Sequence, residues 1–209
     1  MLRPGRDRLS GEVEVDETYV GGAEEGVHGR ETHDKAIVAV AAEVRGRAIG
    51  RIRLRVVPDV AAGSLLPFVE QSVAPGSVVV TDGWRAYEGL PAIGYQHRIY
   101  NIRRSRKQAH ELLPRVHRVA SLLKRWLLGT HQGAISNEHL PYYLDEFTFR
   151  FNRRTSRARG LLFYRLLEQA VRTDHVETDS LFLNTGRGRP RRPRGRGRVP
   201  LRATTTGSR

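Results

Sequence analysis

The sequence predicts an α/β fold in which a mixed sheet, a three-strand antiparallel meander plus parallel strands, is flanked by helices. Three observations lead to this fold class. Residues 11–57 contain three successive strand-like segments, residues 59–100 alternate between helical and strand periods, and residues 112–171 keep a helical period. A chain of 209 residues is long enough for one sizeable domain with a hydrophobic core.

The first three strands are predicted from their hydrophobic patterns. Residues 11–20 alternate valine with carboxylates that include Glu14 and Asp16, as in a half-buried strand with one polar face. Residues 35–44 form a continuous apolar run typical of a central strand, and residues 47–57 alternate apolar side chains with arginine. Glycines separate these segments, so we expect them to form an antiparallel meander.

The middle of the chain changes period twice. Residues 59–73 suit an amphipathic helix, and residues 77–81 form a short buried strand that ends at Asp82. A second helix-like stretch is predicted over residues 83–90, and a fifth short strand over residues 95–100. Strands separated by helical segments are typical of parallel pairing, which makes the predicted sheet mixed.

The last part of the folded chain is predicted to be helical. From residue 112 onwards, apolar side chains such as Val116 and Leu123 recur at steps of three and four residues. His117 and Lys124 lie seven residues apart beside this stripe, so they project from one face of the helix, two turns apart. Two more helical segments follow, the second over residues 160–171.

Composition limits the classes of protein that fit. The net charge of +14 and the pI near 11.1 indicate a polyanionic partner. Residues 186–209 contribute nine arginines and no carboxylate, and removing these nine charges leaves +5 for residues 1–185. The absence of cysteine excludes disulfides and thiolate zinc sites. The sequence contains no apolar run long enough to span a membrane and no secretory signal, so we expect a cytoplasmic protein.

Three regions are predicted along the chain. Residues 1–10 are an N-terminal stub, residues 11–173 form the folded domain, and residues 174–209 form a divergent Arg/Gly/Pro-rich tail that we expect to be disordered. An arginine-rich arm of this kind binds nucleic acid through phosphate charge. The alternative, a tail with no selected role, stays open.

Four segments together resemble a known family. They read VEVDETYVGG, VVVTDGWRAY, VHRVASLLKRWLLGTHQG and YLDEFTFRFNRR. In this order they are similar to the catalytic domain of bacterial insertion-sequence transposases of the DDE type, which belong to the ribonuclease H-like superfamily. The resemblance covers roughly residues 11–170 and implies Asp16, Asp82 and His117 as the metal-binding triad. It implies Lys124, seven residues after His117, as an associated basic residue.

The resemblance also implies a chemistry, partners and a location. Asp16 and Asp82 would hold two divalent ions that support cutting and rejoining of DNA by phosphoryl transfer. Carboxylates suit Mg²⁺, and the imidazole of His117 suits Mn²⁺ at least as well, so we expect activity with Mg²⁺ and a preference for Mn²⁺. DNA, both transposon ends and target, is the expected partner, in the bacterial cytoplasm at the nucleoid. A homo-oligomer is compatible with the sequence.

Each site residue also has a plainer interpretation. Asp16 would be a solvated strand residue, Asp82 a turn residue or helix N-cap, and His117 a packed or surface histidine. Lys124 would belong to an ordinary solvated helix face, together with its basic neighbours. Glu111, six residues before His117, is a reserve ligand. The neighbour of Asp16, Glu17, points to the opposite strand face and is not expected to be a ligand.

Two other functional classes stay open. One is a stand-alone nuclease of the same fold, which would hydrolyse DNA without joining strands. The other is a truncated, inactive remnant that acts only as a basic DNA-binding protein. Relatives carry an N-terminal zinc-binding and helix-turn-helix region, whereas only about ten residues precede the first predicted strand here. We therefore expect non-specific DNA affinity with little recognition of transposon ends.

Overall fold

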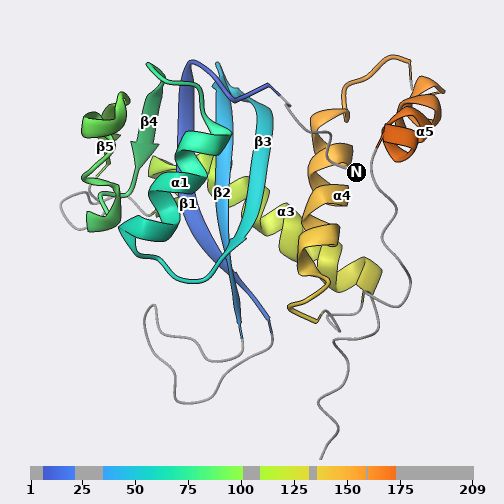
Figure 1. Cartoon of the computed structure of the whole chain (residues 1–209), viewed down its shortest axis with the longest axis horizontal. Helices are drawn as coiled ribbons and strands as arrows, with labels where there is room; N and C mark the ends of the chain where they lie inside the picture. Colours follow the sequence, from blue (N-terminus) through green and yellow to red (C-terminus); the bar gives the residue numbers. More distant parts are fainter. Residues whose placement is uncertain (1–6, 22–34, 101–108, 132–135, 159, 173–209) are drawn as a thin grey trace, which may run out of the picture. The chain divides into compact units, whose positions relative to one another are not determined.

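The structure is a computed structural model that describes residues 7–21, 35–100, 109–131, 136–158 and 160–172. Within these ranges, five strands form one sheet in the order β3-β2-β1-β4-β5 (Figure 1). The predicted fold class, a mixed sheet with flanking helices, is confirmed.

The predicted meander forms half of the sheet. β1 (Glu12–Val20), β2 (Ala36–Arg45) and β3 (Ala48–Val57) pair antiparallel in sequence order. The continuous apolar run of β2 is explained by its position, because an interior strand is covered on both faces and needs no polar side. β3 lies at one edge of the sheet, which accommodates its alternating arginines.

The other half of the sheet is parallel. α1 (Ala62–Ser72) leads to β4 (Val78–Thr81), which pairs parallel with β1, and β5 (Gln96–Ile99) pairs parallel with β4. A parallel strand requires a crossover connection, and α1 supplies it. The strand predicted to end at Asp82 therefore lies directly beside the strand that carries Asp16.

The predicted helix over residues 83–90 is wrong. The segment forms two short 3₁₀ turns instead, η1 (Arg85–Tyr87) and η2 (Pro91–Ile93). Gly83 has a φ of +83°, outside the helical region, and Pro91 has no N–H with which to continue an α-helix. Trp84 is extended, with a ψ of 134°, so the first helical turn begins only at Arg85.

Helices cover both faces of the sheet. α2 (Ala109–Leu112), α3 (Pro114–His131), α4 (Leu140–Asn152) and α5 (Leu161–Arg172) complete the described elements. α1 packs on one face over a core that includes Val13, Val15, Leu65, Phe68 and Val79. α3 and α4 pack on the other over a core that includes Val38, Val40, Leu54, Leu123 and Phe147 (Figure 1).

The second layer of helices corrects the prediction for β1. The alternation of its side chains predicted a half-buried strand with one polar face, but Glu14 is only 2% exposed because α3 covers that face. A carboxylate that is buried in this way must be hydrogen-bonded, and the partners of Glu14 come from α3. The polar alternation of β1 thus marks a buried polar site.

The edge strand β3 is covered locally by the end of α4. The Asn152 side chain accepts a hydrogen bond from the Ile52 N–H at 2.7 Å and donates one to the Ile52 carbonyl at 3.1 Å. Arg154 lies over the Phe151 ring at 4.0 Å and donates to the Gly50 carbonyl at 3.3 Å. An amide side chain on α4 therefore takes the place of a neighbouring strand at this point of the sheet edge.

The residues before β1 pack into the domain. Leu9, assigned to the predicted N-terminal stub, is fully buried and forms a parallel bridge with Val73. Its N–H donates to the Ser72 carbonyl at 2.8 Å, and its carbonyl accepts from Ala74 at 2.7 Å. The predicted tail, residues 174–209, lies outside the described residues, and the domain boundaries stay predictions.

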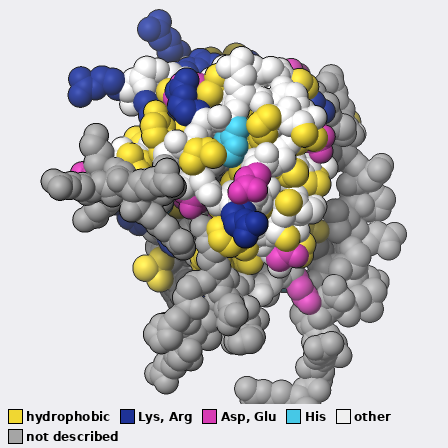
Figure 2. Space-filling model, turned by 90° about the vertical axis from the view of Figure 1, so that its left-hand side faces the viewer, with side chains coloured by type: hydrophobic (Ala, Val, Ile, Leu, Met, Phe, Trp, Pro, Cys, Tyr) yellow, Lys and Arg dark blue, Asp and Glu magenta, His cyan; other side chains and the backbone are white. Residues whose placement is uncertain are grey.

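The surface beside β5 carries side chains of every kind. On the described part of this face, acidic, basic and hydrophobic groups are intermingled (Figure 2). Ile99 and Tyr100, at the end of β5, are 49% and 38% exposed. In the part of the chain that the structure describes, none of the helices has the length and apolar character that crossing a membrane would require.

Candidate active site

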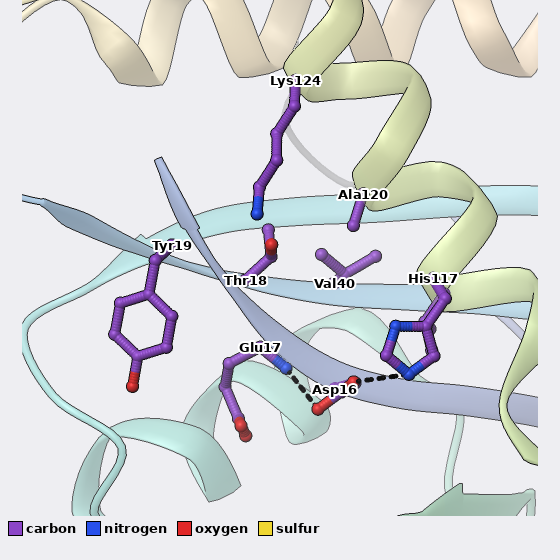
Figure 3. A pocket seen from close by; sticks show the side chains of 9 residues that line it. Asp16, Glu17, Thr18, Tyr19, Val40, His117, Ala120 and Lys124 are labelled. Carbon is purple, nitrogen blue, oxygen red and sulfur yellow. Dashed lines mark hydrogen bonds and ion pairs between the residues drawn. The ribbon is translucent and has the colours of Figure 1, made fainter. Parts of the chain in front are cut away.

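The candidate site is centred on a contact between β1 and α3. Asp16 projects from β1 opposite Val40 of β2, on the sheet face that α3 covers. His117 projects from the first turns of α3, and its Nε2 lies 3.5 Å from Oδ2 of Asp16 (Figure 3). The other Asp16 oxygen accepts the Glu17 N–H at 2.9 Å. Both side chains are partly exposed, His117 at 32% and Asp16 at 17%, while the Nε2 atom of His117 that faces Asp16 is itself buried.

Asp82 follows the neighbouring parallel strand at the same level. Glu14 of β1 is paired with Val80 of β4, and Asp16 and Asp82 each lie two residues further along. Adjacent strands are separated by about 4.8 Å, so the backbones of the two aspartates are neighbours at the point where β4 ends. Asp82 also accepts the Trp84 N–H at 2.9 Å, in the manner of an Asx turn. The turn role suggested by the sequence is therefore present and is compatible with a ligand role.

Gly83 allows the chain to turn directly after Asp82. Its φ is +83°, in the left-handed region that favours glycine. A Cβ at this position would also lie 2.7 Å from Cγ2 of Ile99, closer than carbon atoms approach. A larger residue at position 83 would therefore displace either β5 or Asp82.

A buried tyrosine holds Glu17, the neighbour of Asp16 on β1. The fully buried Tyr87 donates its hydroxyl to Glu17 at 2.5 Å. Burial raises the pKa of Tyr87 well above its ordinary value, and the charges of Glu17, Asp16 and Asp82 raise it further. The two residues are seventy positions apart, so this bond carries no local sequence signal.

The shifted pKa of Tyr87 predicts a loss of stability in alkali. Its pKa is raised in the folded chain and stays near 10 in the unfolded chain, so above about pH 10 the native state binds more protons than the unfolded state. The free energy of unfolding therefore falls as the pH rises through that range, and Tyr87→Phe is expected to weaken the fall. Urea unfolding of both proteins at about pH 8 and about pH 10.5 measures the two slopes. Tyr142→Phe, at a 51% exposed tyrosine, is the control and should keep the parent slope.

Asp16 and His117 line a cavity of about 250 Å³ between β1, β2 and α3 (Figure 3). The lining side chains are those of Asp16, Glu17, Thr18, Tyr19, Val40, Val116, His117, Ala120 and Lys124. Lys124 extends from α3 towards Thr18, two helical turns beyond His117, as its spacing predicted (Figure 3). Burial of its ammonium group and, to a lesser degree, the charge of Lys35 lower the pKa of Lys124.

The predicted residues are therefore brought together in part. Asp16, His117 and Lys124 line one cavity, whereas Asp82 lies at the end of the next strand and is not among the lining residues. Among the described residues, no group of three or more His, Asp and Glu side chains is close enough to hold a metal ion. The reserve ligand Glu111 is exposed on α2 and does not line the cavity. The triad as a metal site stays a prediction.

Asp16 and His117 present donor atoms of the kinds that bind divalent ions. A carboxylate oxygen and an imidazole nitrogen 3.5 Å apart can both reach one ion, and they are donors that Mg²⁺ and Mn²⁺ accept. A third carboxylate, that of Asp82, follows the adjacent strand. The side-chain types of Asp16, His117 and Asp82 fit a divalent ion, and so does the placement of Asp16 and His117.

Glu14 is a residue of this region that the sequence did not identify. It lies two residues before Asp16, and its carboxylate accepts the backbone N–H groups of Arg115 and Val116, at 2.7 and 3.1 Å. These partners are about a hundred residues away in sequence, so no local motif announces them. In the sequence, only its position on the same strand face as Asp16 indicates that Glu14 belongs to this region.

Comparison with known proteins gives two matches. The family of ISXO2-like transposase domains matches residues 8–152, from the segment before β1 to the end of α4. An uncharacterized transposase-like protein of Haemophilus influenzae is 32% identical over 97 residues, which is 46% of this chain and 77% of that protein. The residues matched by the family include Asp16, Asp82, His117 and Lys124.

Proposed function

Because this chain belongs to the family of ISXO2-like transposase domains, we propose that it cleaves and joins DNA strands by divalent-metal-dependent phosphoryl transfer. Its fold is the α/β, ribonuclease H-like arrangement of that class, with a five-stranded mixed sheet and flanking helices. The observation that carries the proposal is the 3.5 Å approach of Asp16 Oδ2 and His117 Nε2, from elements a hundred residues apart.

Three side chains would hold the metal. Asp16 and Asp82 would supply carboxylate oxygens from neighbouring parallel strands, and His117 would supply Nε2 from α3. When bound, divalent ions activate the attacking hydroxyl and neutralise charge on the leaving oxygen. Tyr87 supports this arrangement because it holds Glu17 by a 2.5 Å hydrogen bond, which keeps that carboxylate directed away from His117.

Two lysines would contact the DNA backbone. Lys124 lines the same cavity as Asp16, and Lys35 is near enough for its charge to lower the pKa of Lys124. Two ammonium groups that repel each other gain from a bound phosphate, which neutralises both. Lys124 would act in this way as a point charge on the substrate phosphate and not as a base.

Nicking of supercoiled plasmid by the purified chain tests the proposal. We expect cleavage that requires a divalent ion, proceeds with Mg²⁺ and is faster with Mn²⁺, because an imidazole ligand suits the softer ion. Asp82→Asn should lower the rate by about a hundredfold or more, since a carboxylate ligand contributes several kcal/mol through the metal. Glu88→Gln removes one exposed carboxylate six residues away and should leave the rate unchanged.

The outcomes separate the functional classes. Joining of a labelled DNA end to a target, in the same buffer, identifies a transposase and excludes a nuclease that only hydrolyses. Equal nicking by the parent and by Asp82→Asn would assign the activity to another site or to a contaminant. A folded chain that binds DNA and shows no metal-dependent cleavage would contradict the proposal and favour a DNA-binding role.

A further inference from the structure

A buried carboxylate connects β1 to the start of α3. Glu14 is 2% exposed and receives three hydrogen bonds from two residues of α3. Its Oε2 accepts the backbone N–H groups of Arg115 at 2.7 Å and Val116 at 3.1 Å, and its Oε1 accepts Arg115 Nη1 at 2.8 Å. Arg115 also donates to the Gly46 carbonyl at 2.5 Å, so it reaches the turn between β2 and β3 as well.

The chemistry of a helix start explains why a carboxylate lies there. α3 begins at Pro114, and the first N–H groups of a helix have no partner within the helix. A negative charge at this end also interacts favourably with the helix dipole. A cap is usually provided by a residue just before the helix, whereas here a strand far away in sequence provides it. The cap therefore joins two elements in addition to ending one.

The position of the cap relates it to the candidate site. Glu14 and Asp16 project from the same face of β1, two residues and about 6.6 Å apart along the strand. Arg115 and His117 are also two residues apart, at the start of α3. The hydrogen bonds of Glu14 fix both the rotation of α3 and its position along β1, at the place where His117 must meet Asp16.

We propose that Glu14 and Arg115 form a latch that positions His117 against Asp16, which makes Glu14 a positioning residue of the metal site. This inference rests on the proposed function, because it assigns a purpose to the 3.5 Å contact between Asp16 and His117. Glu14 does not itself bind metal or substrate. It acts through α3, and its loss allows His117 to move away from the carboxylate.

Binding of Mn²⁺ to the full chain tests the latch. Free Mn²⁺ is measured by electron paramagnetic resonance during titration, for the parent, Glu14→Gln and Arg115→Gln. We expect the affinity to fall about tenfold or more in Glu14→Gln, as is common when a residue that orients a metal ligand is lost. Arg115→Gln removes the side-chain ion pair and keeps the backbone hydrogen bonds to Glu14. If Glu14→Gln does not fold, a lower Mn²⁺ affinity of Arg115→Gln tests the latch in its place.

The matched control is Glu12→Gln. Glu12 belongs to the same strand, and its ion pair, at 2.7 Å, is with Arg98 of β5. Its loss should change Mn²⁺ affinity less than twofold by the same titration, in keeping with the small effect of surface ion pairs. Equal affinities for Glu14→Gln, Arg115→Gln and Glu12→Gln would overturn the latch, even if Glu14→Gln lowers the melting temperature.

A double-mutant cycle separates positioning from general destabilisation. If Glu14 acts through His117, Glu14→Gln should cause no further loss of Mn²⁺ affinity when His117 is already alanine. If Glu14→Gln lowers the Mn²⁺ affinity by the same factor in the parent and in His117→Ala, Glu14 acts independently of His117. That result would overturn the inference.

A readout without metal distinguishes failure of the latch from failure of the proposed function. His117 and Val40 line the same cavity, so nuclear Overhauser cross-peaks between the imidazole ring and the valine methyls report the position of α3. A parent chain that binds no Mn²⁺ contradicts the proposed metal site. In that case, loss of these cross-peaks in Glu14→Gln still supports the latch, and their retention overturns it.

Discussion

Replacing Asp16 with asparagine is expected to lower the rate of DNA strand cleavage by about a thousandfold, because a carboxylate that would hold the divalent ions contributes several kcal/mol through them. Asp16 is the residue on which the site converges. It contacts His117 at 3.5 Å, lies level with Asp82 on the adjacent strand and lines the cavity that contains Lys124. The asparagine is nearly the same size, so the circular dichroism spectrum and the urea midpoint should change little while single-turnover cleavage is lost.

The neighbouring residue provides the control for this prediction. Glu17→Gln removes one negative charge from the same strand, one residue along. Its side chain is held by Tyr87, and glutamine can still accept that hydrogen bond. The expected loss of cleavage is less than about tenfold, the value of one modest hydrogen bond. If Glu17→Gln were as inactive as Asp16→Asn, the metal ligand on β1 would have been assigned to the wrong carboxylate.

The largest effect on stability is expected from Phe68→Ala. Phe68 is 1% exposed, lies in the core between α1 and the sheet, and carries the Arg55 guanidinium 5.7 Å from its ring centroid. Removing a buried phenylalanine costs about 3–5 kcal/mol, because the lost contacts and the remaining cavity add together. Since domains of this size are stable by about 5–15 kcal/mol, the variant should lose a large part of its free energy of unfolding.

Urea unfolding of Phe68→Ala and Phe163→Ala measures this difference. Phe163 is the same residue type on α5 and is 62% exposed, so its removal should change the free energy of unfolding by less than about 0.5 kcal/mol. Mn²⁺ affinity should be unchanged in both variants under conditions where they are folded, because α1 lies on the face opposite α3. Equal destabilisation by both substitutions would show that the core of the domain is not the one described.

The framework of the site could be predicted from the sequence because it depends on local patterns. A β-branched run that ends at Asp82, a strand that carries Asp16 and a spacing of seven residues between His117 and Lys124 are all visible without tertiary information. These patterns predicted the elements and the sheet, and they predicted that His117 and Lys124 would share a helix face. Asp16, His117 and Lys124 line one cavity, and their roles in a metal site stay predictions.

The parts of the site that the sequence did not predict depend on pairs of residues that are distant in sequence. The buried environment of Glu14 arises from α3, whose partner atoms follow it by about a hundred residues, and the alternation of β1 alone indicates solvent on that side. The Tyr87 bond to Glu17 spans seventy residues. The helix predicted over residues 83–90 failed for a local reason, because Gly83 is left-handed and Trp84 is extended, which leaves only short 3₁₀ turns after them.

The amide clamp of Asn152 on Ile52 has a consequence for how copies of this chain behave towards one another. An uncovered outer strand presents unpaired backbone groups to which a second polypeptide can add, and such additions lead to fibrils. By occupying both backbone groups of Ile52, Asn152 blocks one point at which an incoming strand would pair with β3. The last turn of α4 thus opposes aggregation through this strand edge. A shortened protein that ends before residue 152 would lack the contact.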